Sequence, residues 1–407
     1  MSRESTSKTN WFSVYLLIGA GVVCAFQIGK APPALTLIRN ELGLDLVFSG
    51  WIIGIYALFA AIVGIFGGAF ADTAGYRRSL LFGLCSIAFG SFSGAFAPNG
   101  QILLISRFVE AIGYLPIVVS VPALLGQVTA TEGDRRLAAG IWGAYMPAGT
   151  AAMMLAAPLF LADQDFGWRG LWLINGAIAG AYALGLALLI PTLGTRRETG
   201  LTKVTPLKDA CSILKTPGSL LLGLFFATYA GNYLTVYGFL PTMLIEDLGV
   251  APALAALLSA LAVAINICGN IFGGWLRKKN VSFAKIIFFG SLFTGLTSFG
   301  IFSEFLGFEM RYVMAVLYSA FCGVIPGATW SAAASLVPKT RLVGTAIGWV
   351  VQGGNIGTLA LPPLAAIVVA TYSGWYAASF VVAGSSLLGA GLALLIARFA
   401  SEKTQTG

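Results

Sequence analysis

The sequence predicts an all-α integral membrane protein with twelve spanning helices, arranged as two six-helix bundles related by a pseudo-two-fold axis. Three observations predict this class. The 407 residues are 57% hydrophobic and only 10% charged, whereas a soluble domain is about 45–50% apolar and about 25% charged. Twelve apolar segments have the length of a membrane crossing, which needs about 20 residues. The two halves of the chain also repeat each other.

The twelve segments follow one another with short polar connections. The first begins at Trp11, after a polar start from Met1 to Asn10 that lacks the layout of a signal peptide. Glycine and proline recur inside the segments, as is ordinary for helices in lipid. The expected spans are 11–38, 49–70, 79–97, 101–127, 138–162, 168–190, 218–242, 251–276, 283–304, 311–337, 342–371 and 375–399.

The distribution of positive charge predicts the orientation. Most of the 24 lysines and arginines fall in the terminal segments and in the loops between even-numbered and odd-numbered spans. Because cytoplasmic loops of membrane proteins carry this excess, both termini are expected in the cytoplasm. The net charge of +8 is thereby explained by topology, without nucleic acid. Anionic lipid headgroups are the expected partners of these charges, in a membrane interpreted as the bacterial cytoplasmic (inner) membrane.

An internal repeat divides the chain into two halves. Trp142 matches Trp349 and Trp168 matches Trp375, both at an offset of about 207 residues, and Leu42-Gly43 recurs as Leu248-Gly249 at a closely similar offset. Two matched halves suit a transporter that rocks rigid bundles around a central site. The predicted units are an N-terminal bundle over 1–190, a cytoplasmic linker over 191–217 with at most one surface helix, and a C-terminal bundle over 218–407.

The composition argues against an enzyme, a metal site and a bound cofactor. The chain contains no histidine, and its five cysteines are scattered without a CxxC spacing. These facts exclude imidazole-based catalysis and make a metal cluster or disulfide framework improbable. A nucleotide-binding G-x-x-x-x-G-K-[ST] motif does not occur. We therefore expect no catalytic residue, no metal and no cofactor.

One loop carries a recognisable motif. Between the second and third spans, Gly68, Asp72, Gly75, Arg77 and Arg78 fit the pattern G-x-x-x-D-x-x-G-x-R-R. The pattern resembles the signature of the major facilitator superfamily. The resemblance implies that these five residues form a latch that stabilises the outward-facing state on the cytoplasmic side. The alternative is a plain basic loop that anchors the chain inside. The second copy, near Gly273, lacks the acidic residue, which implies an asymmetric latch.

Two further stretches support the same resemblance. Arg107, Glu110 and Gly113 are similar to the superfamily's R-x-x-[QE]-G/A-x-G motif, and the fifth span holds a degraded form of the Gly/Pro-rich motif of its exporters. The eleventh span is loosely similar to anion-uptake branches, including the cyanate and nitroimidazole transporter-like group. Members of the superfamily usually work as single chains, so the resemblance implies a monomer.

Three ionisable residues are expected deep inside the spans. Lys30, Arg107 and Glu110 lie about 12, 9 and 14 Å from the outer ends of the first and fourth spans at 1.5 Å per residue, so they share one layer. Buried charges in lipid mark functional sites by default. Lys30 or Arg107 is the candidate anchor for an anionic substrate, and Glu110 is the candidate for proton coupling. The alternative is a structural Arg107–Glu110 pair, with Lys30 reaching the interface.

Uncharged polar side chains in the spans complete the predicted binding site. A buried amide must find hydrogen-bond partners, whereas a tyrosine is as often a packing or interface residue. The full set of substrate-binding candidates is Gln27, Lys30, Tyr56, Arg107, Tyr145, Asn232, Tyr233, Asn266, Gln352 and Asn355.

These features predict a secondary active transporter that works by alternating access. The expected cargo is a small organic or inorganic anion taken up from outside, with a proton as coupling ion. The alternative within the same superfamily is an exporter of drugs or metabolites. From a different class, a transporter-like receptor or a flippase-type scaffold would share the same helices.

Overall fold

The computed structural model describes residues 8–161, 167–190, 206–337 and 342–405, and this part of the chain contains helices and no strand. Eleven helices or helix series in it are long and apolar enough to cross a membrane. The all-α membrane class is therefore confirmed. The third expected span corresponds to α6 (Tyr76–Ala95), which begins with two arginines and is not among the eleven. The count of twelve stays a prediction.

Most spans are single continuous helices, whereas the first, second and fifth are interrupted. The first consists of α1 (Trp11–Gly29) and α2 (Ala31–Leu42). The second is α3 (Leu46–Gly54), η1 (Ile55–Ala57), α4 (Leu58–Val63), η2 (Gly64–Phe66) and α5 (Gly67–Ala74). The fifth is α8 (Glu132–Gly143), α9 (Tyr145–Ala156) and α10 (Pro158–Leu161). The continuous helices besides α6 are α7 (Gly100–Val128), α11 (Gly167–Leu189), α13 (Pro217–Glu246), α14 (Pro252–Lys278), α15 (Phe283–Ile301), α16 (Phe308–Ser335), α17 (Val343–Tyr372) and α18 (Tyr376–Gln405).

Local sequence explains where several helices begin and end. The side chains of Asn10, Asp45, Asn99 and Thr131 accept hydrogen bonds from the first turns of α1, α3, α7 and α8, which satisfies amides that have no partner within the helix. The break before α2 coincides with prolines in its first turn, since proline lacks the amide that would continue α1. Gly43 and its repeat equivalent Gly249 both adopt φ of +64°, so the repeat is also a backbone repeat.

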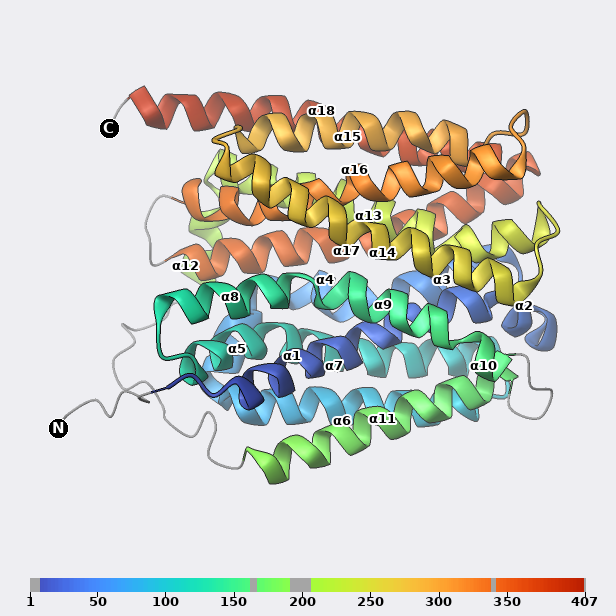
Figure 1. Cartoon of the computed structure of the whole chain (residues 1–407), viewed down its shortest axis with the longest axis horizontal. Helices are drawn as coiled ribbons and strands as arrows, with labels where there is room; N and C mark the ends of the chain where they lie inside the picture. The colour runs from blue at the N-terminus through green and yellow to red at the C-terminus, as the bar shows by residue number, and fades with distance from the viewer. Residues whose placement is uncertain (1–7, 162–166, 191–205, 338–341, 406–407) are drawn as a thin grey trace.

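The helices of the first half of the chain gather on one side of the molecule and those of the second half on the other (Figure 1). The start of α1 and the end of α18 lie at the same end of the molecule. Within the expected linker, residues 191–205 lie outside the described part, and α12 (Pro206–Leu214) packs against α17 and α13. The domain boundaries stay a prediction.

Several helix pairs join the halves, chiefly the second span with α17 and α9 with α14, and α2 also lies against α13. The backbones of the first pair approach closely. A Cβ atom on Gly50 would lie 2.7 Å from Cα of Pro363, and one on Gly64 would lie 2.8 Å from Cβ of Gln352. At one end of the interface Arg39 forms an ion pair with Glu246 at 2.5 Å. Small residues thus let the halves touch along their length.

Candidate functional site

Three charged side chains meet inside the N-terminal half. Lys30 Nζ lies 2.7 Å from Oε1 of Glu110, and Arg107 forms an ion pair with Oε2 of the same carboxylate. All three side chains are at most 1% exposed. We call these residues the triad. Glu110 is shared by two cations, so the triad carries a net charge of +1.

Backbone geometry explains how the triad assembles. Lys30 stands at the break between α1 and α2, where its side chain enters the space between α6, α7 and α11. Glu110 and Arg107 are one turn apart on α7. Gly90 of α6 permits the close approach of α7, because a Cβ atom there would lie 2.7 Å from Cγ of Glu110.

Uncharged groups complete the hydrogen bonds of Lys30. Its ammonium donates to Gln27 Oε1 at 2.7 Å and to Ser91 Oγ at 2.6 Å, and it lies 4.5 Å from the ring centre of Trp172. Gln27 Nε2 donates in turn to Asn175 Oδ1 at 3.4 Å. Sequence reasoning missed Ser91, Trp172 and Asn175. Ser91 in the third span and Asn175 in the sixth could have been found from the sequence, because they are polar residues at the depth of Lys30.

Arg107 is held by the first and second spans. Its guanidinium donates to the carbonyl oxygen of Gln27 at 2.9 Å and lies 5.0 Å from the ring centre of Tyr56. The Tyr56 hydroxyl donates to the carbonyl oxygen of Cys24 at 3.2 Å. The structure therefore brings Gln27, Tyr56 and the triad into one connected network. The Arg107–Glu110 pair of the structural alternative is present, but its expectation that Lys30 reaches the interface is wrong, because Lys30 is fully buried and pairs with Glu110.

Of the other predicted binding residues, Tyr145 and Asn355 both contact Tyr114, whose ring centre lies 5.5 Å from that of Tyr56; the rest belong to the C-terminal half. Tyr145 stacks on Trp142 with ring centres 4.0 Å apart. Asn355 donates to the carbonyl oxygen of Val351 on its own helix. Asn266 donates to the carbonyl oxygen of Ser319, whereas the hydroxyl of Tyr233 has no partner among the described residues. Gln352 reaches from α17 to the backbone of the second span.

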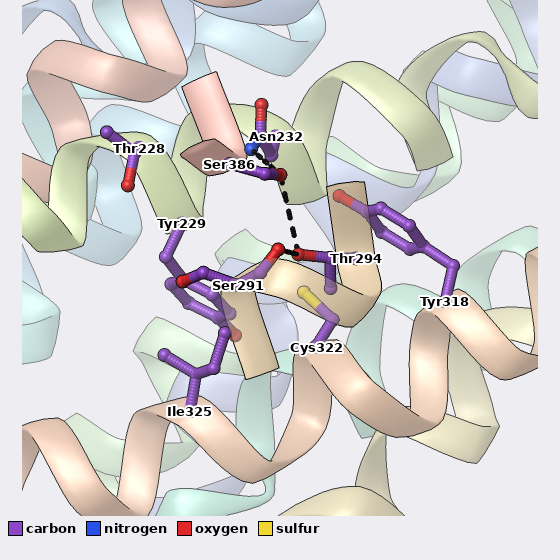
Figure 2. Close-up of a pocket in the computed structure, with 9 residues that line it drawn as sticks. All are labelled: Thr228, Tyr229, Asn232, Ser291, Thr294, Tyr318, Cys322, Ile325 and Ser386. Carbon is purple, nitrogen blue, oxygen red and sulfur yellow. Dashed lines mark hydrogen bonds between the residues drawn. The ribbon is translucent and has the colours of Figure 1, made fainter. Parts of the chain in front are cut away.

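Asn232 belongs to a small polar pocket inside the C-terminal half (Figure 2). Its amide donates to Ser386 Oγ at 3.0 Å, and Ser386 lies 3.4 Å from Thr294 Oγ1. The hydroxyls of Thr228 and Thr294 donate to carbonyl groups of their own helices, which leaves their oxygens as acceptors. The volume is about 10 Å³, the scale of one water molecule. Its lining residues come from the first, third, fourth and sixth spans of this half, which are the positions that supply the triad together with Ser91 and Trp172 in the N-terminal half.

Five residues of the loop between the second and third spans are predicted to form a latch, and the surroundings of three of them are described. Arg77 donates to the carbonyl oxygens of Ala187 (3.0 Å) and Ile190 (3.1 Å), at the end of the sixth span in its own half. Gly75 has a φ of +89°, which favours glycine. Arg78 is exposed. Gly68 and Asp72 lie outside the residues whose side-chain surroundings the structure describes.

Comparison with known families identifies the fold. The model of the Major Facilitator Superfamily matches residues 16–350. The chain belongs to this superfamily. Its fold is shared by a solved bacterial homologue of the human lysosomal transporter Spinster in an inward-facing, unoccupied conformation, with a TM-score of 0.78, 17% identity and 99% of each chain covered.

The relatives that the chain resembles are named after different compounds, or after none. An uncharacterized MFS-type transporter, YceJ of Bacillus subtilis, is 27% identical over 84% of this chain and 87% of its own length. The nitrite extrusion protein of the same organism is 30% identical, covering 66% and 64%. The methyl viologen resistance protein SmvA of Salmonella typhimurium is 31% identical, covering 54% and 48%. The chain spans about a third to half the length of several resistance proteins that it matches.

Proposed function

We propose that this superfamily member is a secondary active transporter that moves a small anion by alternating access, coupled to a proton at Glu110. The observation that carries the proposal is the net charge of +1 on the buried triad. An uncompensated charge in the low-dielectric interior of a membrane protein is costly, and it favours a counter-charge of the opposite sign. A small anion supplies that counter-charge.

The geometry of the triad also supplies a coupling mechanism. Both carboxylate oxygens of Glu110 are occupied by cations. Protonation of Glu110 would cancel its charge and leave two buried cations, Lys30 and Arg107. An anion arriving between them would restore the balance that the carboxylate had supplied. Anion and proton would therefore bind together, and each would favour the other by the same coupling free energy.

The test is counterflow of a labelled anion in proteoliposomes, beginning with nitrite. A carrier exchanges labelled for unlabelled solute, whereas a receptor or scaffold does not. Lys30→Ala should reduce anion exchange at least tenfold, since it removes the cation that faces Glu110. Arg135→Ala, which breaks an exposed ion pair with Glu132, is the matched control. Unchanged exchange of every transported anion by Lys30→Ala would exclude the proposed cargo class.

Export of lipophilic or cationic drugs is the second candidate, and the similarity to resistance proteins, including that for methyl viologen, favours it. The same variant separates the two candidates. Lys30→Ala should leave efflux of methyl viologen intact or increase it, because the loss of a buried cation removes repulsion from a cationic cargo. Loss of both activities in a folded variant would point to a structural role for Lys30.

The proposal extends to the oligomeric state, the membrane and the orientation of the chain. The chain would work as a monomer in a bacterial cytoplasmic membrane with both termini in the cytoplasm, among anionic lipids. The motif residues Gly68, Asp72, Gly75, Arg77 and Arg78 would act as the inner latch. The contact of Arg77 with the end of α11 supports a role in fixing this loop to its own half.

A further inference from the structure

Gln352 of α17 reaches across the interface into the backbone of the second span. Its Nε2 donates to the carbonyl oxygens of Ala61 at 2.9 Å and Ile62 at 3.0 Å, and its Oε1 accepts from the amide of Ile65 at 3.0 Å. In a continuous α-helix the amide of Ile65 would donate to the carbonyl oxygen of Ala61, four residues earlier. The side chain of Gln352 therefore binds both the amide and the carbonyl group that would have formed this helical hydrogen bond.

The helix is broken where this amide enters. α4 ends at Val63 and the next three residues form η2, a 3₁₀ turn, before α5 begins. A side chain inserted into the hydrogen-bond ladder is one of the known causes of a kink. Gly64 and Gly348 make room for it. A Cβ atom on Gly64 would lie 2.8 Å from Gln352 Cβ, and one on Gly348 would lie 3.2 Å from the carbonyl oxygen of Gly64.

The internal repeat provides a comparison within the same molecule. The offset that aligns Trp142 with Trp349 pairs Gln352 with Tyr145, which has a phenol in place of the amide. The helix that faces this region of the fifth span, α14, is continuous from Pro252 to Lys278. The break and the inserted amide therefore occur together, on one of the two repeat-related interfaces.

We propose that Gln352 and the break at residues 61–65 form a two-state joint in the transport cycle. In the structure α17 contacts η2 and α5 at the expected cytoplasmic end, so the inserted amide belongs to the state in which that side is closed. When that side opens, the amide withdraws and Ile65 donates to Ala61 again, so that the second span becomes continuous. Gln352 is then a positioning residue for the conformational change, and this role rests on the proposed alternating access.

Both states are accessible because neither leaves a backbone group at the break without a hydrogen bond. In each state the amide of Ile65 and the carbonyl group of Ala61 have a partner, so neither is left unpaired in an apolar surrounding. Only the side-chain amide changes its environment. Gln352 lies about 14 Å from the start of α17 at 1.5 Å per residue, nearer to the expected cytoplasmic end than to the other. Opening on that side would separate it from the second span.

Two variants should shift the equilibrium in opposite directions. Gln352→Leu removes the inserted amide and favours the continuous, open state. Ile65→Pro removes the amide hydrogen in both states, but in the continuous helix its ring would also clash with the carbonyl group of Ala61, four residues earlier, so it favours the broken, closed state. We expect a change of about tenfold in the population ratio for each. Gly64→Ala, which leaves Gln352 in place but fills its space, should resemble Gln352→Leu.

The populations are measured as distance distributions between spin labels in lipid nanodiscs. Opening of the expected cytoplasmic side is reported by labels at Arg136→Cys and Lys278→Cys, which are exposed positions near the ends of α8 and α14. The exposed natural cysteines are replaced by serine, namely Cys85, Cys211 and Cys268.

Asn270→Leu is the matched control, because Asn270 donates only within α14 among the described residues. Opposite shifts for Gln352→Leu and Ile65→Pro support the joint. Shifts in one direction, or none, overturn it. The readout needs no cargo, so failure to transport anions would contradict the proposed cargo while leaving this result intact. A single distance population in the unmodified chain and in every variant would overturn both the joint and alternating access.

Discussion

Glu110 holds two cations in a site that water does not reach. Lys30 and Arg107 each contact one of its oxygens, and all three side chains are buried. Removing one member of a buried ion network leaves the others uncompensated, which costs more than the intact network contributes. Glu110, the one anion of the site, is therefore also the residue on which the burial of both cations depends.

Glu110→Gln should destabilise the protein and abolish proton-coupled transport. The amide keeps the shape but leaves two buried cations with no anion, at a cost of about 3–5 kcal/mol. Thermal unfolding in detergent measures the loss, in a background with Cys85, Cys211 and Cys268 replaced by serine, so that a thiol-reactive dye reports exposure of the buried Cys24 and Cys322. Glu132→Gln, in an exposed pair with Arg135, should change the midpoint very little. Equal midpoints for the two variants would contradict the structural importance of Glu110.

At the scale of elements, each half uses one arginine to close the end of its third helix. Arg169 donates to the carbonyl oxygens of Ala95 and Ala97 at the end of α6 and pairs with Glu41 at 2.7 Å. Arg311 donates to the carbonyl oxygen of Ile301 at the end of α15 and pairs with Asp247 at 2.8 Å. The two arginines stand at different positions of the repeat. In both halves the last carbonyl groups of the helix accept hydrogen bonds from an arginine, but the arginine comes from a different neighbouring helix in each half.

Arg311→Ala should cost more stability than Arg169→Ala. The side chain of Arg311 is 4% exposed and that of Arg169 is 33% exposed, so water can replace the donor lost from Arg169 more readily than the donor lost from Arg311. We expect a loss of about 2 kcal/mol for Arg311→Ala and less than about 1 kcal/mol for Arg169→Ala. Unfolding midpoints of the two variants, compared in the same detergent, check the order. The reverse order would mean that the capping of α15 contributes little.

At the scale of the whole molecule, the arrangement of the two halves brings both ends of the described chain to the same side. The start of α1 and the end of α18 lie at one end (Figure 1), as expected for a protein that crosses the membrane an even number of times. The orientation itself was predicted from the positions of lysine and arginine.

Cysteine labelling in intact cells should verify this orientation. Phe305→Cys, between α15 and α16 where the side chain is 98% exposed, should react with a membrane-impermeant maleimide from outside. Glu132→Cys and Asn280→Cys should react only after permeabilisation. The background is the variant in which the exposed natural cysteines, Cys85, Cys211 and Cys268, are replaced by serine. Labelling of Glu132→Cys in intact cells would contradict the predicted topology, and with it the cytoplasmic placement of the latch.

Sequence alone determined the membrane class, the repeat, the superfamily and the common depth of Lys30, Arg107 and Glu110. These properties depend on composition, spacing and the 1.5 Å rise of a helix, because lipid selects apolar segments whatever their neighbours are. The sequence did not determine the interruptions of the second span, since α-helical and 3₁₀ turns use the same apolar residues.

Only the tertiary structure decided which groups meet across helices. It joined Ser91, Trp172 and Asn175 to Lys30, and it directed Arg77 to the end of α11. It also showed Gln352, which was predicted as a binding residue, inside the backbone of another span. The physical reason is that such contacts depend on how each helix is rotated and how closely it approaches its neighbour. Rotation and approach are set by glycine contacts between segments far apart in the chain.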